Sequence, residues 1–298
     1  MFNKIIFFVL VSLQCFCWAH NPQQPSKIAF LFLTYDDVYH QEYWRAFFSG
    51  HESYYSIYVH SKEPLPDNSN FKSFEIAVRV ETTWENTMRA QIELLREALK
   101  DSTNEKFVFI SDTTIPFHTF ETTYEAFMST SQSIFPFCLN PHQDPLRSGT
   151  FWGYHNYQPQ KIFYPIPSEY QYKHPQWVIL NRKHAELMAE DQEIIAIFDH
   201  YPCDQEHYPG TFLATKGLLH REVLNRQTTY DDWIATSSAS NPFTFTDLHD
   251  EQQLRLAIKA ITGKLYSHIH LYFFGRKFAK DCDLSPLNPY LPYFSAFQ

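Results

Sequence analysis

Apolar runs that end in polar side chains recur near the start of the chain. KIAFLFLT (Lys27–Thr34), YYSIYVH (Tyr54–His60) and FVFISD (Phe107–Asp112) are nearly continuous in apolar residues. Such a run is typical of a strand buried on both faces, and its polar tip indicates a loop at the carboxyl end. A shorter and more alternating run, EIAVRV (Glu75–Val80), predicts a further strand. These runs restrict the chain to folds with a buried central sheet.

An amphipathic segment separates these strands. In NTMRAQIELLREALKD, the residues Met88, Ile92, Leu95 and Leu99 recur at helical spacing, and Asn86 stands where a helix cap is expected. Strands that alternate with helices predict an α/β fold with a mostly parallel sheet. Ligands of such folds bind at the carboxyl ends of the strands.

The second half of the chain repeats this pattern after an irregular stretch. Pro136–Gln176 is rich in proline, tyrosine and histidine, which predicts long surface loops. WVILNRKHAELMAED predicts a strand that runs into a helix, LHDEQQLRLAIKAIT a helix, and KLYSHIHLYFFGRKF a last strand with a basic tip. Neither an internal repeat nor a linker is evident, so residues 21–298 are expected to form a single domain.

The first twenty residues are typical of an export signal. Lys4 precedes the apolar run Ile5–Val11, and Cys17-Trp18-Ala19 provides a small-residue cleavage site. The alternative is a short membrane anchor that the mature chain keeps, but the run is shorter than the roughly 20 residues that a span needs. We therefore expect residues 1–20 to direct export into a secretory compartment, the periplasm or the medium. Any association with a membrane is expected to be peripheral or through this segment.

Charge and cysteine content exclude several classes of function. The net charge of -9 argues against general binding of nucleic acid or anionic membranes, which needs a cationic surface. Apart from the two cysteines in the signal, the chain has only Cys138, Cys203 and Cys282, which allow at most one internal disulfide. Because no CxxC pair is present, a structural zinc site is not expected.

The segment CDQEHYPGT (Cys203–Thr211) concentrates groups that could carry chemistry. Asp204, Glu206 and His207 could bind a metal, or one carboxylate at a helix start could act as a general base, or the segment could be a polar turn. Spacing alone favours the turn and leaves all three open. The pair Asp36-Asp37 also suggests a metal site, but neighbouring strand residues point to opposite faces, so a surface turn is favoured.

The basic tip GRKF presents the same choice. Arg276 and Lys277 could be ordinary solvated charges, or they could be the cations that neutralise a diphosphate leaving group. The chain contains no GxGxxG, GxxxxGK[ST], GxSxG or HExxH motif. A glycine-rich loop is therefore not how this protein would hold phosphate.

Taken together, these segments resemble a known family. The chain is similar to the core-2/I-branching N-acetylglucosaminyltransferases and xylosyltransferase-like glycosyltransferases, most of all to their plant-type branch. The resemblance extends from Lys27 to about Asp281 and rests on motifs in a shared order. They are KIAFLFLT, FFSGHESYYSIYVHSKEP, TTWENTMRAQIELLREAL, FVFISDTTIPFHTFETTYE, HPQWVILNRKHAE, CDQEHYPGT, TYDDW and FFGRKF.

This resemblance implies a GT-A-type α/β fold and an inverting transfer of a sugar such as N-acetylglucosamine or xylose. The donor would be a UDP-sugar and the acceptor a hydroxyl of a glycan or glycoconjugate, with no metal and no other cofactor. It implies that Glu206 is the catalytic base and that Lys277 contacts the donor diphosphate. It also places the uridine near His60 and Ser61 and the acceptor near Trp233.

The chain departs from the family pattern at several positions. Gln205 replaces the usual aspartate before the base, and Pro209-Gly210-Thr211 replaces a leucine-proline-threonine order. The region that carries a diphosphate-binding arginine in animal members has none, which leaves Arg255 and Arg276 as substitutes. These departures keep a rival interpretation open, in which the chain is a non-catalytic, carbohydrate-binding descendant of the same fold. A metal-dependent hydrolase built on Asp204, Glu206 and histidines is the other rival.

Overall fold

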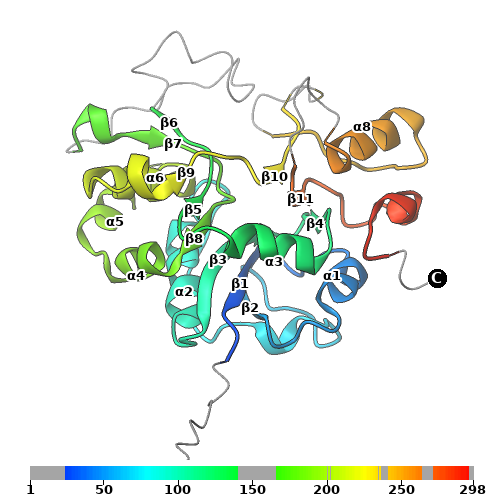
Figure 1. Cartoon of the computed structure of the whole chain (residues 1–298), viewed down its shortest axis with the longest axis horizontal. Coiled ribbons are helices and arrows are strands. Elements are labelled where there is room, and N and C mark those ends of the chain that lie inside the picture. Colours follow the sequence, from blue (N-terminus) through cyan, green and yellow to red (C-terminus); the bar gives the residue numbers. More distant parts are fainter. Residues whose placement is uncertain are drawn as a thin grey trace, which may run out of the picture.

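A six-stranded sheet in the order β2-β1-β3-β8-β5-β9 forms the centre of the molecule (Figure 1). The computed structural model describes residues 24–139, 166–199, 201, 203–233, 235, 241–263 and 271–294. The strands are β1 (Lys27–Thr34), β2 (Tyr55–Ser61), β3 (Asn104–Ser111), β5 (Ser133–Ile134), β8 (Ile179–Asn181) and β9 (Val223–Leu224). Their pairings are parallel except where β8 meets β3 and β5. The predicted α/β fold around a mostly parallel sheet is confirmed.

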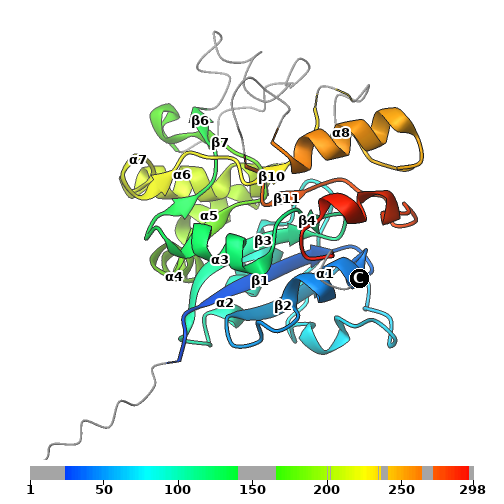
Figure 2. The same cartoon turned by 45° about the vertical axis from the view of Figure 1, so that its right-hand side comes forward.

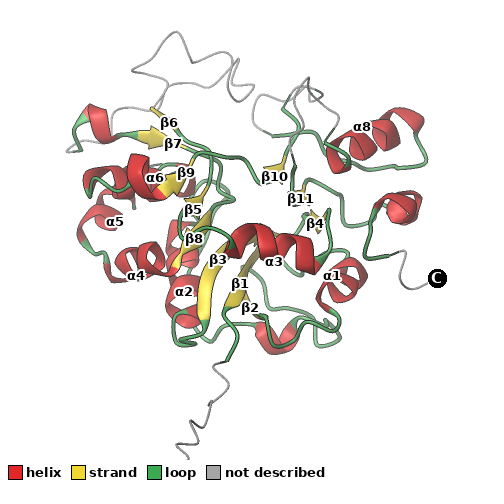
Figure 3. Ribbon diagram, viewed as in Figure 1, coloured by secondary structure: helices red, strands yellow, loops and turns green. Residues whose placement is uncertain are grey.

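Helices cover both faces of this sheet (Figures 2 and 3). One face packs against α1 (Gln41–Phe48) and α3 (Phe120–Met128). The helix α8 (Glu251–Ile261) joins the same apolar cluster but lies farther out, against Ser285–Tyr290. The other face packs against α2 (Met88–Ala98), α4 (Arg182–Glu190), α5 (Glu193–Phe198), α6 (Tyr208–Thr215) and α7 (Leu219–Glu222). Successive side chains of a strand point to opposite faces of the sheet. Because both faces of this sheet are buried, its strands need apolar residues at consecutive positions.

Strand β1 shows how the two faces divide. Phe30 and Phe32 point to the first face, whereas Ala29 and Leu31 point to the second. The ring of Phe30 lies 4.9 Å from that of Phe48, and the ring of Phe32 lies 5.0 Å from that of Trp44, both edge to face. Such aromatic pairs add about 0.5–1.5 kcal/mol each beyond the area that they bury. They fix α1 against the sheet.

Two smaller sheets lie beside the central one. β10 (Thr229–Tyr230), β11 (Phe274–Gly275) and β4 (Ile115–Pro116) pair in the order β10-β11-β4, and β6 (Cys138–Leu139) pairs with β7 (Tyr172–Lys173). Figure 1 shows β10 and β11 beyond the upper ends of β1 and β3. Short 3-10 turns are η1 (Lys72–Phe74), η2 (Ser168–Tyr170), η3 (Asp204–Glu206) and η4 (Ser285–Tyr290).

Two local predictions are wrong. Glu75–Val80 is not a strand: its backbone forms one bridge with the edge strand β2, between Glu75 and Val59, and no ladder beyond it. Asn86 does not cap α2, because that helix begins after Thr87, which makes no side-chain cap bond. The amide of Asn86 instead donates to the carbonyl oxygen of Tyr201 at 2.8 Å.

The prediction of surface loops over Pro136–Gln176 is right only in part where the structure describes it: residues 167–170 are exposed, but the segment that follows them is not. Residues 140–165 lie outside the described residues. Gln171, Tyr172, Lys173 and His174 are buried, and two of them form β7. The predicted last strand is short, since β11 comprises only Phe274–Gly275 and residues 264–270 are not described.

The predicted export segment lies outside the described residues, which begin at Gln24. Across the described ranges, every helix falls short of the length and apolar content that crossing a membrane requires. Cys203 and Cys282 carry thiols, and burial raises the pKa of each to about 11.

Candidate active site

The carboxyl ends of β1, β2 and β3 lie in one row. Thr34 at the end of β1 pairs with Ser61 of β2. Leu33, one residue earlier, pairs with Ser111 of β3, so Asp112 follows at the same edge. This is the edge at which ligands bind in α/β sheets, and β10 and β11 lie next to it (Figure 1).

His60 and Ser61, predicted near the uridine, are both buried at this edge. The Nε2 atom of His60 accepts a hydrogen bond from the backbone N–H of Val80 at 3.1 Å, and burial lowers the pKa of the ring. Among the described residues, Nδ1 of His60 and Oγ1 of Thr34 have no hydrogen-bond partner. Buried polar atoms in native proteins are normally paired, so this edge has polar groups to offer a ligand.

Arg276 directly follows β11 and turns toward the sheet. Its backbone N–H donates to the carbonyl oxygen of Tyr230 at 2.9 Å, and its Nε lies 3.3 Å from Oγ of Ser111. The guanidinium carbon lies 4.5 Å from the centre of the Trp177 ring, which is a cation–π contact. Burial lowers the pKa of Arg276, and the charges of Asp231 and Asp112 act against that effect.

Lys277 is also buried, but it contacts an exposed ring. Its Nζ donates to Oδ1 of Asn241 at 3.1 Å and lies 4.5 Å from the centre of the Trp84 ring. Trp84 itself is 70% exposed. Burial lowers the pKa of Lys277 to about 8, and the neighbouring Arg276 charge lowers it further in the same direction.

Several carboxylates surround these cations. Asp112, Asp231 and Glu206 all interact electrostatically with Arg276. These three carboxylates, Arg276 and Lys277 are called the charged group below. Burial raises the pKa of Asp231 to about 6, whereas Arg276 and a hydrogen bond from Trp233 oppose that rise. Trp233, predicted near the acceptor, thus lies beside the same charged group.

The segment TYDDW places its two aspartates differently. Asp232 accepts hydrogen bonds from the hydroxyl of Tyr230 and the N–H of Ala235, both at 2.7 Å, so it holds the local turn. Asp231 accepts from the side chain of Gln227 at 3.0 Å and interacts with the Arg276 charge. Asp231 therefore belongs to the charged group, whereas its sequence neighbour Asp232 stabilises the turn.

Glu206 ends η3, directly before α6. Its Oε2 accepts a hydrogen bond from Nζ of Lys173, whose side chain is 1% exposed. The Glu206 side chain is 25% exposed, in contrast to the buried Lys173. The carbonyl oxygen of Glu206 also accepts from the N–H of His174 at 2.9 Å. β7 and the residue after it thus hold both the backbone and the side chain of Glu206.

Asp204, two residues earlier, serves a helix. Its Oδ1 accepts from the backbone N–H groups of Thr87 at 3.1 Å and Met88 at 3.2 Å, at the start of α2. Burial raises the pKa of Asp204 to about 6, while these hydrogen bonds act in the opposite direction. A carboxylate engaged in this way does not converge with Glu206 on a metal. The part of the chain that the structure describes holds no group of three or more potential metal ligands.

Gln205 is buried beside Asp204 rather than beside the cations. With its amide nitrogen as donor, it bonds to the carbonyl oxygen of Glu85 at 3.0 Å and to Oδ1 of Asp204 at 2.5 Å. An aspartate at this position could not donate and would place a second negative charge against Asp204. The structure thereby accounts for the glutamine.

Arg255 is not brought into the charged group. It lies on α8, where its guanidinium bonds to Glu251 one turn earlier, and its side chain is 72% exposed. Arg276 and Lys277, by contrast, are buried.

The candidate site includes residues that the sequence did not single out, namely Asp112 and Asp231 of the charged group, Lys173 beside Glu206, and the rings of Trp84 and Trp177. Lys173 gave no signal, because it lies in a stretch that was predicted to be surface loop. A large aromatic side chain in the polar segment TTWENT could have drawn notice to Trp84, since it has no place in an amphipathic pattern.

A second polar cluster has the order of a nucleophilic triad. Oγ of Ser133 lies 2.7 Å from Nδ1 of His184, whose Nε2 lies 3.3 Å from Oε2 of Glu222. Both Ser133 and His184 are fully buried, and the Ser133 hydroxyl already accepts from the N–H of Asn181. A nucleophile must reach its substrate, so this cluster joins β5, β8 and α4 rather than performing catalysis.

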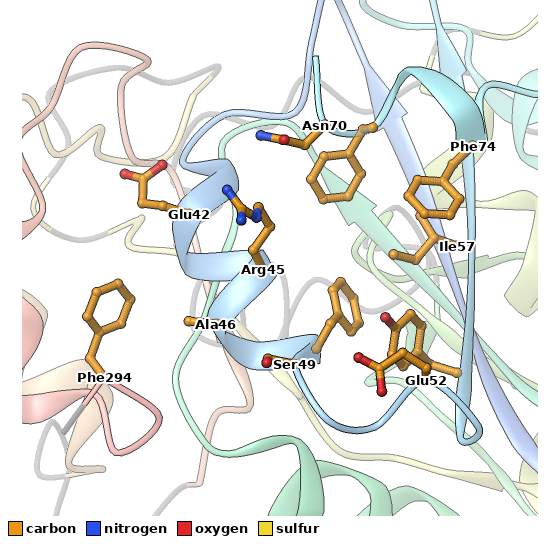
Figure 4. A pocket seen from close by; sticks show the side chains of 12 residues that line it. Glu42, Arg45, Ala46, Ser49, Glu52, Ile57, Asn70, Phe74 and Phe294 are labelled. Atoms are coloured by element: carbon orange, nitrogen blue, oxygen red, sulfur yellow. The ribbon is translucent and has the colours of Figure 1, made fainter. Parts of the chain in front are cut away.

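A surface pocket of about 530 Å³ lies elsewhere, between α1 and β2 (Figure 4). Ile57 and Phe74 form part of its apolar wall, and Glu42, Arg45 and Glu52 line it as well. None of the charged group around Arg276 contributes to its lining. Its position on the α1 side separates it from the candidate active site.

Known proteins resemble this chain over most of its length. The family model described as Branch: Core-2/I-Branching enzyme matches residues 28–257. Glycosyltransferase BC10 from Oryza sativa subsp. japonica is 29% identical, over 90% of this chain and 77% of that protein. The solved structure titled Crystal Structure of A197 from STIV is 9% identical over 59% of this chain and 78% of that chain, with a TM-score of 0.28. The matched range includes Glu206 and Trp233 and ends before Arg276.

Proposed function

Because the chain belongs to the core-2/I-branching enzyme family, we propose that it is an inverting glycosyltransferase that works without a metal ion. That it is a glycosyltransferase follows from the family and from the similarity to Glycosyltransferase BC10. The α/β fold is consistent with the GT-A type. The donor in this proposal is a UDP-sugar, with N-acetylglucosamine or xylose as the sugar, and the acceptor is a hydroxyl of a glycan or glycoconjugate.

One observation carries the proposal: the partly exposed Glu206 side chain lies within electrostatic reach of the buried Arg276, which adjoins Lys277. An inverting transfer needs one base on the acceptor side and positive charge on the side of the leaving group. This arrangement supplies both from the protein itself.

The reaction would proceed in one displacement. The acceptor oxygen forms a bond to the anomeric carbon while the bond from that carbon to the diphosphate breaks, and the acceptor proton passes to Glu206. A well-placed base of this kind contributes about 10² to 10⁴ in rate. Arg276 and Lys277 would meet the negative charge that develops on the departing UDP, as preorganised cations do in low-dielectric sites.

The remaining residues take the roles of binding groups in this proposal. His60 and Ser61, beside Thr34, would receive the uridine, because this edge holds unpartnered buried polar atoms among the described residues. Trp233 would position the acceptor, since it bonds to Asp231 next to the Arg276 charge. Arg255 takes no part, given its ion pair on α8.

We further propose that residues 1–20 direct the chain into a secretory or exported compartment and that residues 21–298 act as one domain. Association with a membrane, if this segment is retained, would be through it. Expression of the full chain with a carboxyl-terminal tag, followed by amino-terminal sequencing of the secreted product, tests the cleavage.

The function is tested by turnover of UDP-N-acetylglucosamine and UDP-xylose with an acceptor panel in the presence of EDTA. We expect wild-type activity to persist with EDTA and Glu206→Gln to lose about 10² to 10⁴-fold in kcat. UDP affinity, measured by calorimetry, should change little in this variant, because Glu206 faces the acceptor side in the proposal.

Glu251→Gln is the matched control, since it makes the same chemical change on the outer surface of α8. Full activity of Glu206→Gln would refute the assignment of the base. Strict dependence of the wild type on Mn²⁺ would refute the metal-free mechanism.

The rival interpretation, a non-catalytic carbohydrate-binding protein, rested on the departures near Glu206. Gln205 bonds to Glu85 and Asp204, so that departure does not alter the carboxylate of Glu206. The glycine of Pro209-Gly210-Thr211 has a structural cause as well: a Cβ at Gly210 would lie 2.9 Å from the ring of His174. Binding to a glycan array without any affinity for UDP would revive the rival.

A further inference from the structure

The proposed function assigns no role to Lys173, the buried lysine beside Glu206. Lys173 lies on β7, paired with Cys138 of β6, and its ammonium group bonds to Oε2 of Glu206. A lysine side chain that is 1% exposed is rare, because removing an ammonium ion from water costs several kcal/mol unless a partner compensates. The carboxylate of Glu206 is such a partner, so each of the two side chains restricts the position of the other.

The backbone of β7 is held in a way that gives this lysine little freedom. On one side, the carbonyl oxygen of Tyr172 lies 2.9 Å from Nδ1 of His207, and the backbone N–H of Tyr172 donates to Oγ1 of Thr211 at 3.0 Å. On the other, the N–H of His174 donates to the carbonyl oxygen of Glu206. Residues 172–174 thus dock against the turn that contains Glu206 through hydrogen bonds before and after Lys173.

A base in an inverting transfer must present one oxygen to the acceptor hydroxyl in a fixed direction. A glutamate side chain has several rotatable bonds, and a misplacement of about 1 Å can cost about 10²-fold in rate. Lys173 holds Oε2 and thereby leaves Oε1 to the acceptor. This resembles the way in which a third group orients the base in other catalytic arrangements.

We propose that Lys173 is a positioning residue: its buried ammonium group fixes the Glu206 carboxylate so that Oε1 receives the acceptor proton. The inference rests on the proposed function, in which Glu206 is the base. Lys173 keeps its own proton throughout, and the proton that leaves the acceptor oxygen ends on Glu206. The electron pair of the broken bond between the sugar and the diphosphate leaves with UDP. Lys173 gains and loses nothing in the reaction.

A double-mutant cycle tests the inference with Lys173→Met, Glu206→Gln and the double variant. The readouts are kcat and KM for UDP-N-acetylglucosamine or UDP-xylose, and UDP affinity by calorimetry. In the wild-type background we expect Lys173→Met to lower kcat by about 10²-fold and to leave UDP affinity within about threefold. In the Glu206→Gln background, the same change should lower the residual kcat by less than about threefold, because the group that Lys173 positions is absent.

A purely structural lysine gives a different result. Damage to the fold would lower kcat by the same factor in both backgrounds, and that outcome overturns the positioning role while leaving Glu206 as the base. If Glu206→Gln alone keeps full activity, Glu206 is not the catalytic base of the proposed function, and the positioning role of Lys173 is refuted as well. The two failures are therefore distinguishable.

Lys183→Met is the matched control. Lys183 also bonds to a carboxylate, that of Glu222 at 2.7 Å, but it is 56% exposed and lies on α4. It should retain wild-type kcat. If Lys173→Met leaves too little folded protein for assay, Lys173→Gln, which keeps a hydrogen-bond donor at this depth, replaces it in the cycle under the same criteria.

Discussion

Neighbouring carboxylates in this chain have different partners, and the partners decide what each can do. Asp204 accepts hydrogen bonds from the first N–H groups of α2, whereas Glu206 bonds to Lys173 and remains partly exposed. Asp232 and Asp231 divide in the same manner, into a turn residue and a member of the charged group. At the scale of single residues, spacing identifies the candidates, and only the partners separate their roles.

Lys277 gives a prediction at this scale. Because burial lowers its pKa to about 8, the side chain is charged below that pH and loses its proton as the pH rises through it. We expect UDP affinity, measured by calorimetry between pH 7 and 9.5, to weaken as the pH rises. Loss of one ammonium contact should amount to about tenfold, or about 1.4 kcal/mol.

Lys277→Arg is the control for this measurement, since a guanidinium group stays charged throughout the range. It should bind UDP with a flatter pH dependence than the wild type. A wild-type affinity that is constant up to pH 9.5 would contradict the role of Lys277 in holding the diphosphate.

At the scale of elements, α2 shows a helix whose start is completed from a distance. Its apolar face follows the predicted spacing, with Met88, Ile92 and Leu95 buried. Its first N–H groups, however, find their acceptor in Asp204, which is 116 residues away from Met88 in sequence. The start of α2 and the turn that carries Glu206 are therefore one structural unit.

Replacement of Asp204 by alanine tests this unit. The N–H groups of Thr87 and Met88 would lose their acceptor, and we expect the free energy of unfolding to fall by about 1–3 kcal/mol. The kcat should fall as well, because the turn before Glu206 is no longer held. Urea unfolding and UDP-sugar turnover measure the two effects.

Asp250→Ala is the comparison, because Asp250 caps α8 by accepting from the N–H groups of Gln252 and Gln253 on an exposed surface. It should cost stability without a change in kcat. Equal kcat in Asp204→Ala and the wild type would show that the two elements are not coupled.

At the scale of the whole molecule, the candidate site is assembled from segments that are far apart in sequence. β11 delivers Arg276 and Lys277 to the carboxyl edge of the central sheet, and β4 holds β11 in an antiparallel pair. The approach is close: a Cβ at Gly275 would lie 1.9 Å from Cζ of Phe117, which is fully buried. Gly275 is therefore required for β11 to sit where it does.

Gly275→Ala should displace β11 and with it both cations. We expect a loss of about 1–3 kcal/mol in the free energy of unfolding, the usual cost of overpacking a core. We also expect weaker UDP binding. The double variant Gly275→Ala/Phe117→Leu removes the ring atoms that the new methyl group would meet, so it should regain part of both properties. An undiminished UDP affinity in Gly275→Ala would contradict this account.

The sequence alone was sufficient for the main strands and helices, because buried strands and amphipathic helices are local patterns. β1 has the predicted bounds, and β2, β3, α4 and α8 lie where expected. The short pieces were not predictable in the same way. Glu75–Val80 has the composition of a strand but forms only one backbone bridge with β2, and Lys173 lies in a stretch without any periodic pattern.

By itself, then, the sequence determined the α/β class, the order of elements and the motifs that relate the chain to sugar transferases, because each of these depends on residues that are contiguous in the chain. Only the tertiary structure decided which charges meet. It set Asp204 against α2, Lys173 against Glu206, and Arg276 against the ends of the strands. The physical reason is that charges interact over a few ångströms of space whatever their separation along the chain. Their burial and pairing depend on how distant elements pack.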